Sequence, residues 1–388
     1  MKCLFRLVGV FVLLLAGRAD AKSPPPEKFQ LPSEVQTGEG SNDTIYFQWY
    51  AARNSGGQKR PAVVLLHALG GNIEVQQKFA RYLSNHRVNA AVMELPYHYH
   101  RFSKNATPQD RFLSADANIS ARTWNQAFSN VSTLVTWLQE RPDVDATRIG
   151  GIGVSLGAIT LHGAMGRDPR IKAGVTFVGG GDFAYIYQHS LIARLFIEKN
   201  RHPISEQDQA TLQTADPLTV AGNNHPRRVL MIQAARDYLI PPRSSQELWE
   251  ALGRPPIRWV DMGHFGLNLA VPQARAPVLS FLNQAWDEAN GPHPEETYLR
   301  APRIYIPTVK AGLISGLDST ITPAVTVQVL SLGTRPDHLA WLHADVGLTL
   351  RGPYAGVAAS VTSYLDVGIG RRLAGDKFRP YVGAQIAF

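Results

Sequence analysis

The sequence is poor in cysteine and in charge. Cys3 is the single cysteine among 388 residues, and it lies close to the N-terminus. The rest of the chain therefore has no disulfide and no thiol chemistry, and its stability must come from core size, which this length allows. Charged residues make up 18% and hydrophobic residues 44% of the chain. These proportions exclude a disordered protein and indicate a globular one.

A concentrated basic surface is also missing. The formal net charge is +8, but the excess of lysine and arginine is scattered along the chain. No basic stripe alternates with aromatic residues, so a nucleic-acid partner is not expected.

Residues 1–21 have the pattern of a secretory signal peptide. Lys2 and Arg6 precede an apolar run over residues 7–16, and Ala19-Asp20-Ala21 provides a small-x-small cleavage site. The run is short for a permanent transmembrane anchor, which is the alternative interpretation. We therefore expect an exported protein, periplasmic or associated with the outer membrane.

Strand and helix patterns alternate over residues 44–292. Continuous apolar runs at 61–66, 90–95 and 173–178 are typical of strands that helices cover on both faces. Amphipathic segments such as 124–138 separate these runs. The alternation predicts an α/β fold with a doubly wound, mostly parallel sheet.

Two segments break this alternation. Residues 22–43 are rich in proline, serine and glycine and are expected to form a linker or irregular lead-in. Residues 183–226 are polar and aromatic without a strand pattern, which predicts a small helical cap on the sheet.

A Gly-x-Ser-x-Gly motif lies between an expected strand and an expected helix. Its central residue is Ser155, flanked by Gly153 and Gly157. A sharp strand-to-helix turn strains the backbone at the serine and requires small residues two positions away on each side. The turn exposes the hydroxyl and places the Leu156 amide at a helix N-terminus, where it can stabilise developing negative charge.

Two further residues follow later strands in the order that a serine nucleophile needs. Asp237 comes after the strand 229–233, and His264 comes after the strand 257–260. With Arg148-Ile149 leading into the serine motif, this order resembles the α/β-hydrolase superfamily. The resemblance covers about residues 44–290 and is nearest to the dienelactone-hydrolase and prolyl-oligopeptidase-like esterase branches.

The resemblance implies a serine hydrolase. Ser155 would be the nucleophile, His264 the general base and then acid, and Asp237 the carboxylate that orients the histidine. Asp182, at the end of a neighbouring strand, is the alternative acid. The expected substrate is a small-molecule or lipid-like ester, less readily an amide or peptide, and no cofactor is required. The alternative function is a catalytically inactive hydrolase-shaped binding or surface module.

The oxyanion hole needs a second amide beside that of Leu156. The resemblance places it on the loop after the strand 61–66, where this sequence has Ala68 instead of the usual glycine. Ala68 or Leu69 would be the donor.

A further loop is expected beside the pocket. There His98 would form part of the pocket wall, and Arg101 would receive an acidic substrate group. A metal site built on His98 and His100 is the alternative, but carboxylates are lacking nearby and hydrolysis needs no metal.

The composition changes near residue 293. No glutamate occurs after Glu296, and apolar residues recur at every second position from Ala340 onward. Residues 293–388 are therefore expected to form a separate antiparallel β module. Its strands and its C-terminal phenylalanine, Phe388, resemble outer-membrane β-barrel ends. With four to six strands, closure of a barrel would need oligomerisation; a soluble sheet or sandwich packed on the hydrolase is the alternative.

Overall fold

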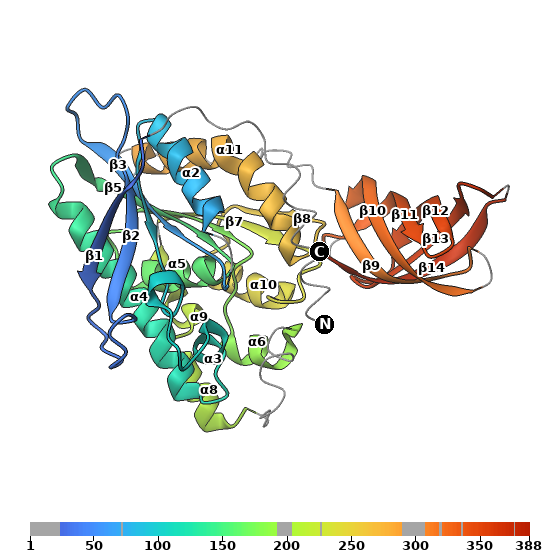
Figure 1. The fold of residues 1–388 in the computed structure, drawn as a ribbon, viewed down its shortest axis with the longest axis horizontal. Helices are drawn as coiled ribbons and strands as arrows, with labels where there is room; N and C mark the ends of the chain where they lie inside the picture. Colours follow the sequence, from blue (N-terminus) through green and yellow to red (C-terminus); the bar gives the residue numbers. More distant parts are fainter. Residues whose placement is uncertain are drawn as a thin grey trace.

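The structure is a computed structural model, and it describes residues 24–70, 73–191, 204–225, 227–288, 307–317, 320–334, 337–375 and 377–388. The predicted signal peptide and residues 289–306 lie outside the described residues. An α/β domain comes first in the chain, and a β-barrel follows it and projects from one side (Figure 1). No helix in the described ranges has the length and hydropathy needed to cross a bilayer.

The α/β domain is built on an eight-stranded sheet in the order β1-β2-β4-β3-β5-β6-β7-β8. The pairs from β4 through β8 are parallel, and β1 and β2 add an antiparallel edge. This confirms the predicted α/β class. The strands are β1 (Glu27–Pro32), β2 (Thr44–Tyr50), β3 (Arg60–Leu66), β4 (Asn89–Met93), β5 (Val144–Val154), β6 (Ala173–Phe177), β7 (Arg228–Ala234) and β8 (Ile257–Val260).

The segment expected as a linker contains the edge strand β1. Its six residues pair with all but the last residue of β2, from Glu27 opposite Trp49 to Pro32 opposite Thr44. Phe29 packs against Phe47 with ring centroids 5.6 Å apart. Proline at the end of an edge strand costs no hydrogen bond in the sheet interior, which is why a proline-rich lead-in can still add a strand.

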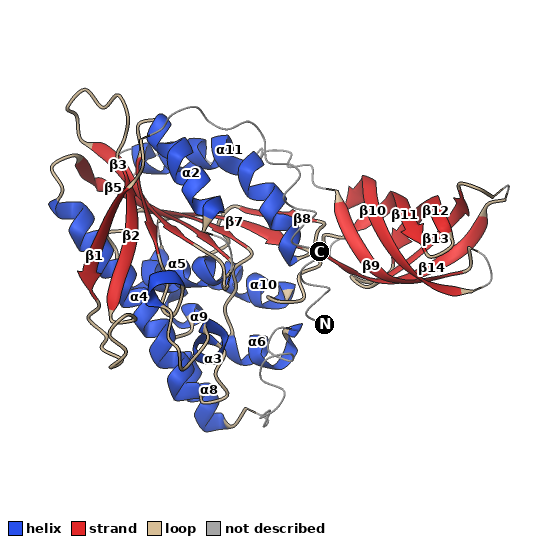
Figure 2. Ribbon diagram, viewed as in Figure 1, coloured by secondary structure: helices blue, strands red, loops and turns tan. Residues whose placement is uncertain are grey.

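Helices cover both faces of the sheet (Figure 2). One face packs against α2 (Glu74–Asn85) and α11 (Leu267–Glu288), and the other packs against α4 (Ala117–Glu140), α5 (Leu156–Arg167) and α10 (Pro242–Ala251). Because each central strand is covered twice, its side chains are apolar without alternation.

Short helices form the described part of residues 183–226 and the loops at the carboxyl end of the sheet. They are η2 (Tyr99–Arg101), α3 (Pro108–Phe112), α6 (Phe183–His189), α8 (Glu206–Gln213), α9 (Pro217–Val220), η4 (Ala221–Asn224) and η5 (His264–Gly266).

The C-terminal module is a closed six-stranded antiparallel barrel in the order β10-β11-β12-β13-β14-β9. Closure occurs because β9 pairs with β10 on one side and with β14 on the other. The expectation that closure needs oligomerisation is therefore wrong. The strands are β9 (Thr308–Ser315), β10 (Ile321–Thr334), β11 (Ala340–Thr349), β12 (Gly352–Ser360), β13 (Leu365–Arg372) and β14 (Arg379–Ala387).

One end of the barrel contacts the α/β domain beside β8 (Figure 1). Asp261, the residue after β8, accepts hydrogen bonds from Gln328 Nε2 at 3.0 Å and from the Ala340 amide at 3.1 Å. Trp259 stacks on His338 with centroids 4.7 Å apart. The segment that leads into His264 is therefore in direct contact with the barrel.

Candidate active site

Ser155 lies at the turn between β5 and α5. Its backbone has φ 54° and ψ −114°, a conformation that non-glycine residues rarely adopt. The side chain is 8% exposed. The strain is held by the hydrogen bond from the Ser155 amide to Phe177 O at 2.8 Å and by the helix that starts at the next residue.

The two glycines of the motif are required by space. A Cβ at Gly153 would lie 2.3 Å from Gly157 O, and a Cβ at Gly157 would lie 2.4 Å from Leu66 O. Both contacts are with backbone atoms, which cannot move aside cheaply. The helix carrying the Leu156 amide can therefore approach the sheet this closely only with glycine at both positions.

Three side chains from separate elements form a hydrogen-bonded chain. Ser155 Oγ lies 2.9 Å from His264 Nε2, and His264 Nδ1 lies 2.7 Å from Asp237 Oδ2. With the ring proton on Nδ1, the imidazole donates to the carboxylate and accepts from the serine hydroxyl. All three residues are at least 92% buried, with exposures of 6% to 8%. This is the arrangement that activates a serine nucleophile.

Asp237 is itself held in place by the loop after β7. Its Oδ1 accepts from the amides of Leu239 at 2.9 Å and Ile240 at 2.8 Å, leaving Oδ2 for His264. Asp182, the alternative acid, instead caps α6 by accepting from the Tyr185 amide at 3.1 Å. Burial and the neighbouring Glu247 raise the pKa of Asp182. The geometry thus favours Asp237 as the partner of His264.

His98 holds the loop that is expected to supply the second oxyanion donor. Its Nε2 accepts from the Gly70 amide at 3.0 Å, and its Nδ1 donates to Pro96 O at 2.8 Å. Burial lowers the pKa of His98 to about 4, so the ring is neutral. Both nitrogens are occupied, so the ring positions the loop that carries Gly70; its place in the pocket wall stays a prediction.

His67 also positions the loop after β3, and the sequence pattern predicts no role for it. It is fully buried, with Nδ1 2.9 Å from Ala68 O and Nε2 accepting from the Leu95 amide at 3.0 Å. Burial and the nearby His98 lower its pKa well below the usual value. A histidine directly after a buried strand was the available signal. Ala68 and Leu69 are partly buried on the loop that these two rings hold.

Arg101 does not reach a substrate. It is 0% exposed, and its guanidinium donates to Glu94 O at 3.1 Å and to Asn42 O at 2.6 Å. Burial lowers its pKa to about 9. The prediction that Arg101 receives an acidic substrate group is therefore wrong, because the cation is used to join loop backbones that lie far apart in the sequence.

The described residues bring together one group with the donor types of a metal site, but elsewhere than predicted. The expectation that carboxylates are lacking near His98 and His100 is wrong, because His100 Nδ1 lies 2.8 Å from Glu94 Oε1. Among the described residues, however, neither histidine belongs to a group that could hold a metal ion. His343, Asp345 and Asp366 converge inside the barrel. The Lys310 ammonium lies 2.7 Å from Asp366 Oδ2. The cation beside these carboxylates is a lysine, and the cluster contains none of Ser155, Asp237 and His264.

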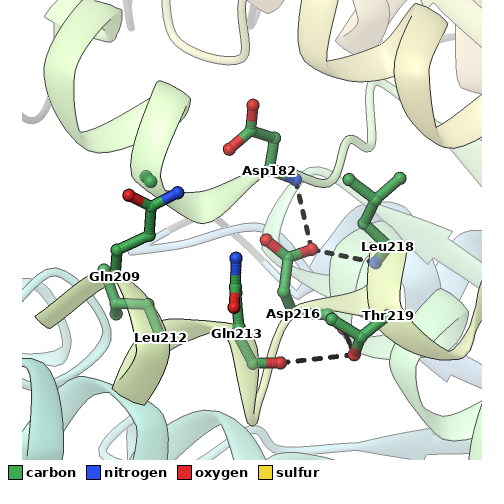
Figure 3. A pocket seen from close by; sticks show the side chains of 8 residues that line it. Asp182, Gln209, Leu212, Gln213, Asp216, Leu218 and Thr219 are labelled. Atoms are coloured by element: carbon green, nitrogen blue, oxygen red, sulfur yellow. Dashed lines mark hydrogen bonds between the residues drawn. The ribbon is translucent and has the colours of Figure 1, made fainter. Parts of the chain in front are cut away.

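A small pocket lies in the cap between α6, α8 and α9 (Figure 3). Its lining includes Asp182, Gln209, Gln213 and Asp216, but none of the triad residues. Asp216 accepts from the Asp182 amide at 3.1 Å and the Leu218 amide at 2.8 Å. Its carboxylate therefore joins segments of the cap. The pocket lies between these packed segments and is separate from Ser155, Asp237 and His264.

The fold and this site define a class of protein: the N-terminal domain has the α/β-hydrolase fold, which serine esterases and peptidases share. Residues 116–265, which include Ser155, Asp237 and His264, match the family model of the prolyl oligopeptidase family. A search of curated proteins finds no significant match.

Solved structures with the same fold include both peptidases and esterases. An acylaminoacyl peptidase from Pyrococcus horikoshii has a TM-score of 0.53 and 17% identity, covering 71% of this chain but 44% of the peptidase. An acetyl xylan esterase from Paenibacillus sp. R4 has a TM-score of 0.52 and 20% identity, covering 62% of this chain and 80% of the esterase. An α/β hydrolase from Penicillium sp. sh18 has a TM-score of 0.50 and 15% identity, covering 68% of this chain and 100% of its own.

Proposed function

We propose that this protein is an exported serine hydrolase that cleaves a carboxylic ester through an acyl-enzyme. The observation that carries the proposal is the chain of hydrogen bonds from Ser155 Oγ through His264 to Asp237, with separations of 2.9 and 2.7 Å. The strained backbone at Ser155 adds to it, because such strain concentrates at functional sites.

The geometry supports a two-step reaction. Ser155 Oγ attacks the ester carbonyl carbon while His264 Nε2 takes the hydroxyl proton. The carbonyl oxygen becomes negative and is stabilised by the Leu156 amide, with Ala68 or Leu69 as the second donor. His264 returns its proton to the alcohol oxygen as the C–O bond breaks, leaving Ser155 acylated. Water then repeats the sequence and releases the acid.

An ester is proposed over an amide because of what the leaving group requires. An alcohol leaves more readily than an amine, so an ester demands less of the general acid and of the oxyanion hole. The hole of this chain has Ala68 where the resemblance expects glycine. A small-molecule or lipid-like ester is therefore the substrate class that this site fits best.

The test is activity-based labelling of the intact protein with a fluorophosphonate, alongside hydrolysis of short p-nitrophenyl esters. Ser155→Ala is expected to abolish labelling and to lower kcat by at least about 10⁴-fold, since nothing replaces the nucleophile. Ser129→Ala, which removes a surface hydroxyl bound to Glu34, is the matched control and should change neither. Labelled protein is expected in the periplasmic or outer-membrane fraction.

Each other outcome has a clear meaning. Labelling that persists in Ser155→Ala would show that another residue is the nucleophile. A folded wild-type protein that neither reacts nor hydrolyses esters would favour the alternative, a non-catalytic binding module. Labelled protein confined to the cytoplasm would contradict export through residues 1–21.

A further inference from the structure

The barrel has its apolar side chains on the outside. Of the 22 exposed large hydrophobic residues among the described positions, 20 lie between Leu313 and Ile386. These exposed residues form an apolar band around the outside of the barrel, and every strand contributes to it. One central member from each strand, all between 43% and 58% exposed, is Leu313, Val325, Val346, Val357, Ile369 and Val382.

The interior of the barrel contains buried charged and polar side chains beside a small aliphatic and aromatic cluster. Lys310, His343, Asp345 and Asp366 are each 1% to 2% exposed and are paired with one another inside. Along the six described strands, the remaining charged side chains are Arg371, Arg372 and Arg379, at the end away from the α/β domain. Between the two ends, the apolar band therefore includes no charged side chain from these strands.

A water-soluble barrel would have charged side chains on its outer surface and apolar side chains inside. This barrel instead has apolar side chains outside and buried charges inside. Scattered exposed apolar residues are common, but a continuous apolar band of this kind marks a surface that is covered. A protein partner would cover one side of the barrel, whereas the band runs over all six strands. The hydrolase covers only one end (Figure 1). A cover that surrounds the whole barrel is a lipid bilayer.

The height of the band agrees with this reading. The strands have 8 to 14 residues, with four of them at 8 or 9. Nine residues at about 3.4 Å each, tilted by about 40°, span about 23 Å, close to the roughly 25 Å apolar band of outer-membrane barrels. Trp341 and Tyr364, 61% and 51% exposed, lie at the hydrolase end, where interfacial aromatics are expected.

The far end of the barrel is basic. Its turns and strand ends, residues 316–320, 350–351 and 371–379, hold five basic residues against two acidic ones, Asp318 and Asp376, which lie outside the described residues. The basic residues are Arg351, Arg371, Arg372, Lys377 and Arg379. A cationic end beyond an apolar band suits the phosphate headgroups of the opposite leaflet.

We propose that the barrel inserts into a bilayer as an anchor, with the hydrolase on the near side and the basic turns at anionic headgroups of the far leaflet. The lumen is filled by side chains, including Tyr354 and Tyr381 with ring centroids 5.9 Å apart. The barrel would therefore hold the hydrolase at the membrane without forming a pore.

Flotation of the purified full chain with phosphatidylcholine vesicles tests insertion. Val346→Arg and Ile369→Arg place a charge in the middle of the band and are expected to lower the bound fraction at least about 30-fold. Leu350→Arg makes the same change at the far turn, where Leu350 is 82% exposed, and should bind like wild type. Heat-modifiable migration in detergent checks that each barrel still folds.

Orientation is tested in sealed vesicles by a membrane-impermeant maleimide on chains with Cys3→Ser. Val361→Cys, at the hydrolase end, should be labelled from outside; Ala374→Cys, in the far turn, only after permeabilisation. Arg371→Gln with Lys377→Gln should remove the preference for phosphatidylglycerol-containing vesicles, up to about 30-fold. Lys59→Gln with Lys104→Gln, on the exposed hydrolase surface, is the matched control.

Three results would overturn the inference. The first is a wild-type chain that stays monomeric in solution beside the vesicles. The second is a soluble oligomer that Val346→Arg dissociates, which would mean that the band covers a second copy of the chain. The third is equal access of the maleimide to both cysteines. Because none of these measurements involves Ser155, they remain valid whether or not the protein hydrolyses esters.

Discussion

At the residue scale, burial sets the charge state of several histidines. His162, on the helix that follows Ser155, is 1% exposed, and neither ring nitrogen has a hydrogen-bond partner among the described atoms. Burial lowers its pKa to about 3. His98, which accepts from the Gly70 amide, has its pKa lowered to about 4 by burial as well. The folded domain therefore keeps imidazoles neutral where the unfolded chain would protonate them.

This difference predicts acid lability. Below pH 6.5 the unfolded chain binds protons that the folded chain excludes, so the unfolding free energy falls as the pH falls, by about 3 kcal/mol for each such histidine between pH 6.5 and 4. His162→Leu removes one group and should flatten the dependence by about that amount, as measured by urea unfolding at several pH values. His189→Leu, at an exposed position, is the control. An unchanged pH dependence in His162→Leu would contradict the assignment.

At the element scale, the last barrel strand packs against the segment between β8 and His264. A Cβ built on Gly263 would lie 2.1 Å from Ala387 O, at the end of β14. The Phe388 amide bonds to Val309 O at 2.8 Å, so this end of β14 is fixed to β9. The backbone that carries His264 thus has a rigid neighbour.

Gly263→Ala is expected to displace that backbone. A shift of about 1 Å in the position of His264, the proposed general base, can cost about 10²-fold in rate. We therefore expect kcat to fall by roughly that factor while KM changes less. Gly222→Ala is the matched control, since a Cβ there has nothing within 4 Å. Steady-state ester hydrolysis measures both. Wild-type kcat in Gly263→Ala would show that the strand end yields without moving His264.

How far the sequence predicts this structure depends on the range of the interactions involved. The α/β class and the turn at Ser155 follow from local patterns, because buried strands and paired glycines have short-range signatures. Barrel closure does not, since β9 must pair with β14 about seventy residues later. Arg101 illustrates the same limit: a charged loop residue suggests the surface, yet its acceptors include Asn42 O, 59 positions away.

At the scale of the whole molecule, one buried ion network joins the two domains. Arg236, adjacent to Asp237, is 2% exposed; its Nε lies 2.6 Å from Asp261 Oδ1 and its Nη1 lies 3.8 Å from Asp366 Oδ1 in the barrel. The same guanidinium donates to Ser360 Oγ and Ser363 O. Arg236, the neighbour of Asp237 in the chain, therefore connects the α/β domain with the barrel interior.

On the barrel side of the network, the charge of Arg236 and its neighbours sets the pKa values of the buried groups. Burial alone would raise the pKa of Asp366, but the His343 hydrogen bond and the charges of Lys310 and Arg236 hold it well below its ordinary value. Burial lowers the pKa of His343, yet hydrogen bonds to Asp345 and Asp366 outweigh it and raise that pKa. Removing Arg236 would leave buried carboxylates short of a partner.

Arg236→Ala is therefore expected to destabilise the protein by about 3–5 kcal/mol, the cost of an unpaired buried charge, and to lower kcat because Asp237 loses its fixed neighbour. Arg243→Ala, which breaks an ion pair to Glu247 with the arginine side chain 62% exposed, should cost less than about 1 kcal/mol. Urea unfolding in detergent, followed separately by fluorophosphonate labelling for the hydrolase and heat-modifiable migration for the barrel, tests both. If Arg236 couples the domains, the two transitions coincide in wild type and separate in Arg236→Ala; coincident transitions in the variant would mean that other contacts, such as Gln328 with Asp261, suffice.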